Sequence, residues 1–177
     1  MSQVGKSAVV LALDAGVRET GWAVFKDGHI EATGFIKVSS RHRIDAADRV
    51  KHLVRCLDQL VEQWDPDEVA CCQPTGIGWR VPALELLDAA LSDWSRRHWL
   101  CLYAYTAQEV RTAVAGHPNA SRGDLGYAVM MRFGLIGQSK TTHEWEAIAV
   151  GDYHHSRWPA DSGNPYDVDQ ANKNCRG

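Results

Sequence analysis

Two acidic residues and one histidine lie where an α/β protein would collect its chemistry. Asp14 ends an apolar run over residues 8–13, which is typical of a strand buried on both faces. A carboxylate at that strand end would face the crevice where α/β sheets place ligands. His143 and Glu146 are three residues apart, so they share a helix face and could chelate one metal ion. Alone, each feature is more typical of a turn residue or of an ordinary helix start.

A second apolar run, residues 68–72, predicts another buried strand and ends in Cys71 and Cys72. Cysteine is among the most buried residue types, so by itself this segment indicates only a core position. The chain has five cysteines and none of them forms a C-x-x-C pair, so no zinc site is indicated.

An aromatic and several basic side chains could contact nucleic acid. Trp79 lies between Gly78 and Arg80 in a glycine-bearing loop. It is either an anchor folded onto the core or a surface on which a base could stack. Arg122 belongs to one of three basic clusters, and each cluster taken alone is typical of a solvated face.

The elements that would position these residues follow from apolar periodicity and from capping signals. Thr106 with Glu109 forms a capping box, Gly116 ends that helix, and Thr142 is expected to cap the last helix. Strands are predicted over 8–14, 21–25, 29–38, 68–72 and 99–104, and helices over 44–64, 82–98, 107–116, 121–133 and 143–155. This order predicts an α/β fold with a mixed sheet, antiparallel at first and then parallel through right-handed crossovers.

Length and composition limit the possible classes of protein. The 177 residues suit one domain, assigned to residues 1–158, followed by a polar tail over 159–177 that is expected to be disordered. A net charge of −3 argues against a protein that coats nucleic acid nonspecifically. No apolar run approaches the ~18 residues of a membrane span, and the start lacks a signal-peptide pattern, so we expect no membrane association and a cytoplasmic location.

Four segments in this order resemble the RuvC-type Holliday-junction resolvases. They are VLALDAG at 10–16 with TGWAV at 20–24, PDEVACCQ at 66–73, TAQEVR at 106–111 and HEWEAIAV at 143–150. Each motif is weak alone, but together they cover residues 8–155. The resemblance implies an RNase H-like fold, with a five-stranded mixed sheet flanked by helices. It also implies a homodimeric endonuclease that cuts four-way DNA junctions.

The resemblance further implies a catalytic and metal-binding site made of Asp14, Cys72, His143 and Glu146. In such a site a pair of Mg²⁺ ions, with Mn²⁺ as a substitute, would clamp the attacking and leaving oxygens. Arg122 would face the phosphates. Trp79 would lie in the junction-probing loop, with Arg80 holding the adjacent phosphate.

Cys72 departs from the family pattern, which has a glutamate at this position. A thiolate is a soft ligand and Mg²⁺ prefers oxygen, so we expect impaired nuclease activity. The main alternative is a catalytically inactive module that binds branched DNA. Two weaker alternatives are an actin-like ATPase, which needs about twice this length, and a thiol enzyme with Cys72 as nucleophile and His143 as base. For the homodimer, the apolar side chains of the predicted helix over 82–98 are the expected contact surface.

Overall fold

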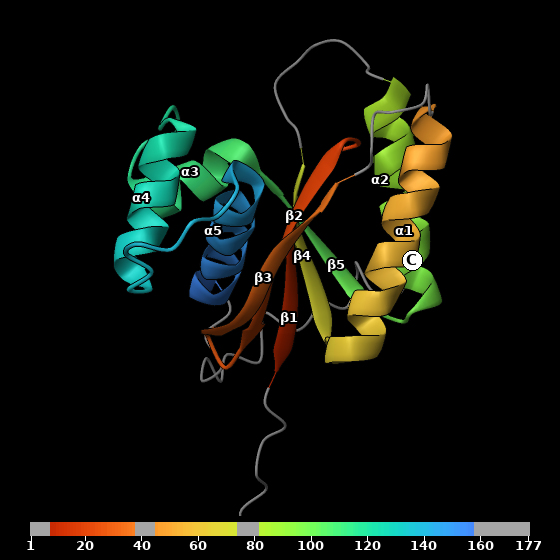
Figure 1. Ribbon diagram of the computed structural model, residues 1–177, viewed down its shortest axis with the longest axis horizontal. Helices are drawn as coiled ribbons and strands as arrows, with labels where there is room; N and C mark the ends of the chain where they lie inside the picture. Colours follow the sequence, from red (N-terminus) through yellow and green to blue (C-terminus); the bar gives the residue numbers. More distant parts are fainter. Residues whose placement is uncertain (1–7, 38–44, 74–81, 158–177) are drawn as a thin grey trace, which may run out of the picture.

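A five-stranded mixed sheet carries helices on both of its faces (Figure 1). The computed structural model describes residues 8–37, 45–73 and 82–157. The strands are β1 (Val9–Asp14), β2 (Glu19–Lys26), β3 (His29–Lys37), β4 (Glu68–Gln73) and β5 (Cys101–Thr106). The helices are α1 (Ala46–Trp64), α2 (Pro82–Arg97), α3 (Ala107–Ala115), α4 (Arg122–Arg132) and α5 (Thr142–Arg157).

The sheet has the strand order β3-β2-β1-β4-β5, and its first three strands form an antiparallel meander. The β2–β3 hairpin turns at Asp27 and Gly28, which both have positive φ, as an Asp-Gly turn predicts. β4 pairs in parallel with both β1 and β5. This confirms the expected mixed sheet, and it brings the carboxyl ends of β1 and β4 to one edge, with Asp14 beside Cys72.

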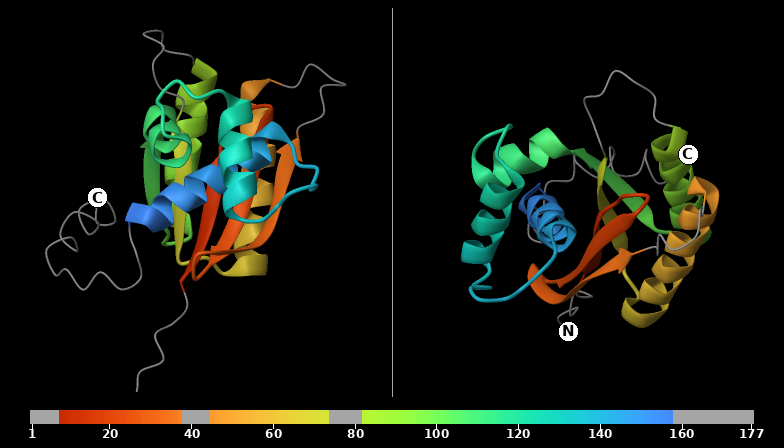
Figure 2. Two further views of the ribbon diagram at one scale, coloured as in Figure 1. Left: turned by 90° about the vertical axis from the view of Figure 1, so that its left-hand side faces the viewer. Right: turned by 45° about the horizontal axis from the view of Figure 1, so that its top comes forward.

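Side chains of the central strand alternate between two apolar layers. Leu11 and Leu13 of β1 pack with α1 and α2, whereas Val10 and Ala12 pack with α3, α4 and α5. Figure 2 shows these two helical layers on opposite sides of the sheet. Because both faces of β1 are covered, its continuous apolar sequence is that of a fully buried strand, as expected.

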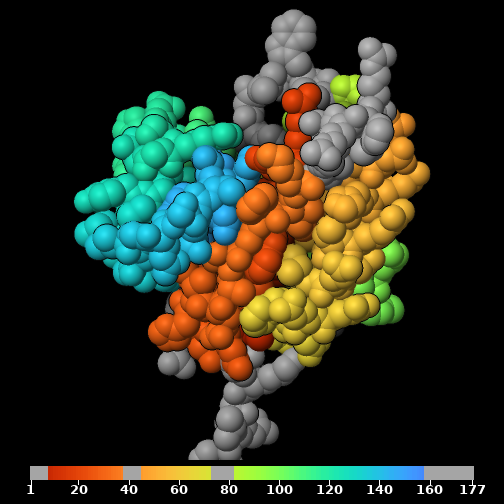
Figure 3. Space-filling model, viewed as in Figure 1, coloured from red at the N-terminus to blue at the C-terminus, as the bar shows by residue number. Residues whose placement is uncertain are grey.

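Helix α5 lies closest to the sheet on its side. The residues from Ala147 to Gly151 are buried, and a Cβ added at Gly151 would lie 2.1 Å from the ring of Phe25. The start of α5 lies against β3, as the space-filling view shows (Figure 3). Among the described residues, no helix is both long and apolar enough to cross a membrane.

The turn from α2 to β5 differs from the sequence prediction. Trp99 was expected to begin a strand, but β5 begins at Cys101. Trp99 instead adopts φ 58° and is 94% exposed. The amide of Trp99 donates to Arg96 and that of Leu100 donates to Ser95, which closes α2 with a Schellman motif. Glycine usually occupies this position, so the sequence carries no signal for the helix end.

The apolar side chains of α2, the expected dimer contact, are buried within the protomer only in part. Leu87, Leu91 and Trp94 are buried against the sheet and α1 within the protomer. The indole nitrogen of Trp94 donates to Asp58 of α1 at 3.1 Å. Ala83, Leu84 and Ala90 of the same helix are only partly buried, so a dimer contact through α2 stays a prediction.

Candidate active site

A pocket of about 350 Å³ lies at the carboxyl ends of β1 and β4. Its walls include five residues that the sequence selected for chemistry: Asp14, Cys72, Arg122, His143 and Glu146. They come from two strands and two helices that are far apart in the chain. Trp79 and Arg80, the other two predicted site residues, lie outside the described residues.

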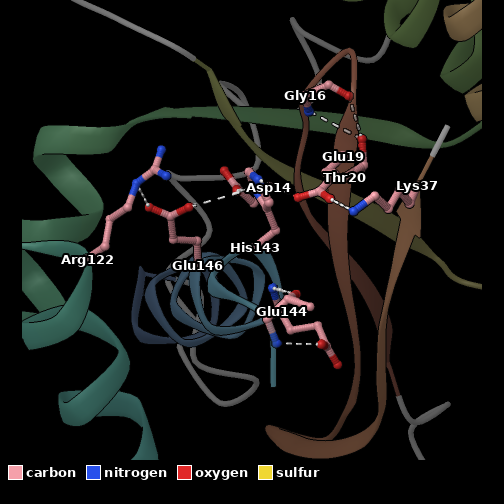
Figure 4. Close-up of polar contacts among 10 residues, drawn as sticks. Asp14, Gly16, Glu19, Thr20, Lys37, Arg122, His143, Glu144 and Glu146 are labelled. Atoms are coloured by element: carbon pink, nitrogen blue, oxygen red, sulfur yellow. Dashed lines mark hydrogen bonds and ion pairs between the residues drawn. The ribbon is translucent and has the colours of Figure 1, made fainter. Parts of the chain in front are cut away.

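The turn that follows Asp14 is closed by Thr20. Its hydroxyl donates to the Gly16 carbonyl at 2.9 Å and accepts from the Gly16 amide at 3.2 Å. A Cβ at Gly16 would lie 2.5 Å from the Glu19 carbonyl, so the tight turn requires glycine there. Because Thr20 closes the turn, the Asp14 carboxylate is available to face the pocket, where it meets His143 (Figure 4).

The close approach of α5 to β2 depends on Gly21. This glycine is the β2 partner of Asp14, and a Cβ at its position would lie 1.9 Å from the carbonyl oxygen of His143. Any larger residue would therefore push the first turn of α5 away from the sheet. Gly21 thus sets the distance at which His143 meets Asp14.

The first turn of α5 is fixed by a capping box on Thr141, one residue before the predicted cap Thr142. The Thr141 hydroxyl accepts from the amide of Glu144, and the Glu144 carboxylate accepts from the amide of Thr141. Thr142 has Trp145 three residues later, which cannot close a capping box. Glu144 also accepts from Thr33 of β3, and Lys140 donates to Thr33, so the cap is tied to the sheet.

Asp14, His143 and Glu146 form a compact ligand group. Nδ1 of His143 lies 2.6 Å from Asp14 Oδ2 and 3.9 Å from Glu146 Oε2. One ligand atom from each residue lies within 4.8 Å of the others. Within the described residues, these three are the group whose spacing and donor types fit a metal ion. One nitrogen and two carboxylate oxygens suit a single divalent cation.

Negative charge dominates the electrostatics of this group. Burial, followed by the nearby charge of Asp14, raises the pKa of Glu146, while Arg122 at 3.2 Å and His143 act in the opposite direction. The hydrogen bond to Asp14 raises the pKa of His143, although burial opposes this shift. Two carboxylates around a histidine ring attract positive charge, so this arrangement favours binding of a cation.

Cys72 lines the same pocket but lies outside the group of three ligand atoms. Burial, together with the charge of Asp14, raises the pKa of its thiol to about 12. The thiol therefore stays protonated at neutral pH, and a protonated thiol is no ligand for a hard cation. The residues present therefore fit one ion, and Cys72 supplies no oxygen ligand for a second.

The sequence analysis missed Glu19 at the start of β2. Its Oε2 lies 3.6 Å from Nε2 of His143, and its Oε1 forms an ion pair with Lys37 at 2.8 Å. The hydrogen bond and charge of Lys37 lower the pKa of Glu19. Counting back from the hairpin pair Lys26–His29 would place Ile36 opposite Glu19, but a bulge at Val24 and Phe25 shifts this partner to Lys37. The sequence held no signal for this shift.

Comparisons with known proteins find similarity in sequence to curated nucleases. No protein-family model matches the chain. The crossover junction endodeoxyribonuclease RuvC of Salinibacter ruber is 26% identical over 165 residues, covering 89% of this chain and 90% of that protein. The RuvC of Caulobacter vibrioides is 28% identical over 150 residues, covering 82% of this chain and 88% of that protein.

Solved structures give the same result for the fold. Thermus thermophilus RuvC aligns with a TM-score of 0.69 at 20% identity, covering 84% of this chain and 95% of that one. The structure of T. thermophilus RuvC in complex with a Holliday junction substrate aligns with a TM-score of 0.69 at 20% identity. This alignment covers 83% of this chain and 92% of that one.

Fold and site together define an α/β protein that has the fold of Thermus thermophilus RuvC and a ligand group at the carboxyl ends of its central strands. Within that class the chain is similar to the RuvC proteins, the family that its four sequence motifs resemble.

Proposed function

We propose that this chain is a structure-selective endonuclease that resolves four-way DNA junctions by metal-dependent hydrolysis of a phosphodiester. The observation that carries the proposal is the convergence of Asp14, His143 and Glu146 within 4.8 Å of one another in a pocket beside Arg122. Its curated relatives are named crossover junction endodeoxyribonucleases and align over more than four fifths of the chain.

The proposed ion is Mg²⁺, with Mn²⁺ as a substitute, held by Asp14, His143 and Glu146. Two of these residues offer the carboxylate oxygens that Mg²⁺ prefers, and the imidazole suits Mn²⁺ better than Mg²⁺. When bound, the ion supplies positive charge at the phosphate oxygens and an activated water.

The protein's own residues position the metal ligands and the phosphate. Asp14 is fixed by the β1–β4 pairing, and His143 reaches it from α5 with Nδ1 at 2.6 Å. Arg122 spans from α4 to Glu146, and its side chain is 61% exposed, so it can reach a phosphate while its Nε stays near the carboxylate. Pairing a guanidinium with a phosphate oxygen would hold the scissile group over the ligand group.

A second candidate function is a module that binds branched DNA without cutting it, and Cys72 is the observation that favours it. The test incubates a synthetic four-way junction with the unmodified chain and with Cys72→Glu, with Mg²⁺, with Mn²⁺ and without metal. We expect Cys72→Glu to raise Mg²⁺-dependent cutting at least tenfold, roughly 1.4 kcal/mol in barrier.

Asp14→Asn in the Cys72→Glu background is the matched control, and it should abolish cutting while junction binding persists. Cutting by the unmodified chain supports the nuclease. Binding in all variants with no cutting in any supports the binding module, and a chain that neither binds nor cuts junctions contradicts both.

We further propose that Trp79 stacks on a base at the junction centre and that Arg80 holds the adjacent phosphate. Base stacking on an aromatic ring contributes about 1–3 kcal/mol, and a phosphate contact adds a salt-sensitive term. Trp79→Ala should therefore weaken binding to four-way junctions and leave binding to linear duplex nearly unchanged. A loss of thermal stability with normal junction binding would instead identify Trp79 as a core residue.

A homodimer in the cytoplasm completes the proposal. Symmetric cutting of two strands calls for two sites related by a two-fold axis, and closed dimers are the common solution. The partly buried Ala83, Leu84 and Ala90 of α2 remain the proposed contact, whereas Leu87, Leu91 and Trp94 pack within the protomer. Sedimentation at micromolar concentration should show a dimer, and a monomer with or without junction DNA would contradict it.

A further inference from the structure

His143 lies between two carboxylates, one at each ring nitrogen. Nδ1 points to Asp14 Oδ2 at 2.6 Å, on the side of the ligand group. Nε2 points to Glu19 Oε2 at 3.6 Å, on the side of β2 (Figure 4). Nδ1 is therefore the atom that faces a metal ion held by Asp14 and Glu146.

The two carboxylates have opposite effects on the ring proton. Asp14 accepts a hydrogen bond from Nδ1 and so favours a proton on the atom that must donate a lone pair to a metal ion. A carboxylate beside Nε2 favours the other tautomer, with the proton on Nε2 and a free lone pair on Nδ1. Protein metal sites commonly use such an outer carboxylate on a ligating histidine.

Glu19 is itself held in place for this contact. Its other oxygen pairs with Lys37 at 2.8 Å, so one carboxylate bridges a lysine and the histidine. Glu19 lies within the turn that the Gly16–Thr20 hydrogen bonds close, and Thr20 is its direct neighbour. The present 3.6 Å exceeds a hydrogen bond by about half an ångström. Hydrogen bonds at catalytic sites are often this long before the substrate complex forms.

Resting on the proposed function, we propose that Glu19 is a positioning residue: it fixes the orientation and tautomer of His143 so that Nδ1 serves as a metal ligand. Glu19 itself stays outside the ligand group, because it contacts the far nitrogen of the ring. Glutamine can replace it in this role, since the amide oxygen also accepts a hydrogen bond from Nε2.

The test measures Mn²⁺ binding to the full chain without DNA, from the electron paramagnetic resonance signal of free Mn²⁺. Glu19→Ala should weaken binding about 10–100-fold, the usual effect of losing an outer partner. Glu19→Gln should retain most of the affinity. Glu31→Ala, which removes an exposed carboxylate from the same hairpin, is the matched control and should bind as the unmodified chain does.

A spectroscopic readout separates positioning from a merely structural role. With Mg²⁺ bound, ¹⁵N shifts of the His143 ring should report a proton on Nε2 in the unmodified chain and in Glu19→Gln. Glu19→Ala should show a mixture of tautomers. If Glu19→Ala fails to fold, Glu19→Thr provides the same test with a β-branched residue that suits a strand.

Three results would overturn the inference: unchanged Mn²⁺ affinity in Glu19→Ala, an equal loss in Glu19→Gln, or no Mn²⁺ binding by the unmodified chain. An equal loss in the glutamine variant would mark Glu19 as a direct ligand. Failure of the proposed function is distinguishable, because normal Mn²⁺ binding without junction cutting would contradict the nuclease and leave the role of Glu19 intact.

Discussion

Helix α5 carries two histidines that make similar contacts in different surroundings. His143, near its start, has Asp14 at Nδ1 and Glu19 at Nε2. His154, near its end, has the Tyr105 hydroxyl at Nδ1 at 2.7 Å and Glu68 at Nε2 at 3.0 Å. The side chain of His143 is 24% exposed and lines a pocket, whereas His154 is 1% exposed and lies beside the ring of Tyr103.

The comparison shows that partners on both ring nitrogens do not by themselves make a functional histidine. His154 has the shorter contact at Nε2, yet its ring is enclosed by side chains from β4 and β5. His143 has room beside it and a second carboxylate, Glu146, within reach of the same nitrogen. His143 differs from His154 in its access to the pocket and in the ligand atoms that converge beside it. We therefore expect His143 to control activity and His154 to control stability.

The largest expected effect is on activity at His143. In the Cys72→Glu background, His143→Ala should lower Mg²⁺-dependent junction cutting at least 100-fold, within the range of about 10²–10⁴ for losing a group at the reacting centre. Thermal unfolding should change by less than about 2 °C, which corresponds to under 1 kcal/mol in a chain of this size. A large loss of stability would erase the distinction between the two histidines.

The complementary change is His154→Ala, which should act on stability. Removing a buried ring leaves a cavity and takes away the hydrogen bonds to Tyr105 and Glu68, together about 3 kcal/mol. Scanning calorimetry should show a Tm lower by about 6–12 °C. Mn²⁺ binding at low temperature should be unchanged, and loss of that binding in a folded variant would show that His154 also supports the site.

A smaller effect should appear in the pH dependence of stability, through two groups near the start of α5. The pKa of Glu146 and that of His143 are both raised in the folded chain. The folded state then binds protons more tightly, so this stability is complete below the unfolded pKa of each group and is lost as pH rises through its folded pKa. Between pH 5 and pH 8 the metal-free chain should therefore lose a few degrees of Tm from these groups.

Glu146→Gln isolates that contribution, because it removes one titrating group and leaves the surroundings of His154 unchanged. The Tm of this variant should depend less on pH than that of the unmodified chain over the same range. Adding Mn²⁺ to the unmodified chain should also reduce the dependence of its Tm on pH. If the Tm of both proteins changed equally with pH, this result would contradict the raised pKa of Glu146.

Local signals predicted most of the elements that build this site. The Asp27–Gly28 turn, the Thr106–Glu109 capping box and Gly116 at the end of α3 are found as expected. Each depends on residues within four positions of one another, so it is encoded by the sequence alone. The errors came where the local signal was atypical: Trp99 occupies a helix-ending position that usually holds glycine, and Thr141 precedes the more obvious Thr142.

Packing decided what the site contains. Asp14 and His143 are separated by 129 positions, and their types were predicted but their distance was not. That distance depends on Gly21, which lets α5 approach β2, and the presence of Glu19 opposite Lys37 depends on a bulge that shifts the β2–β3 register. Close approach and register are set by how whole elements fit together.

The sequence by itself therefore determined the order of strands and helices, the chemical types at their ends and the RuvC-type resemblance. The tertiary structure added the distances at which Asp14, His143 and Glu146 meet, the raised pKa of the Cys72 thiol, and the packing of part of α2 inside the protomer. The physical reason is the distance along the chain over which each kind of interaction acts. Hydrogen bonds of turns and caps act within a few residues, whereas burial, charge coupling and register arise only when distant segments pack together.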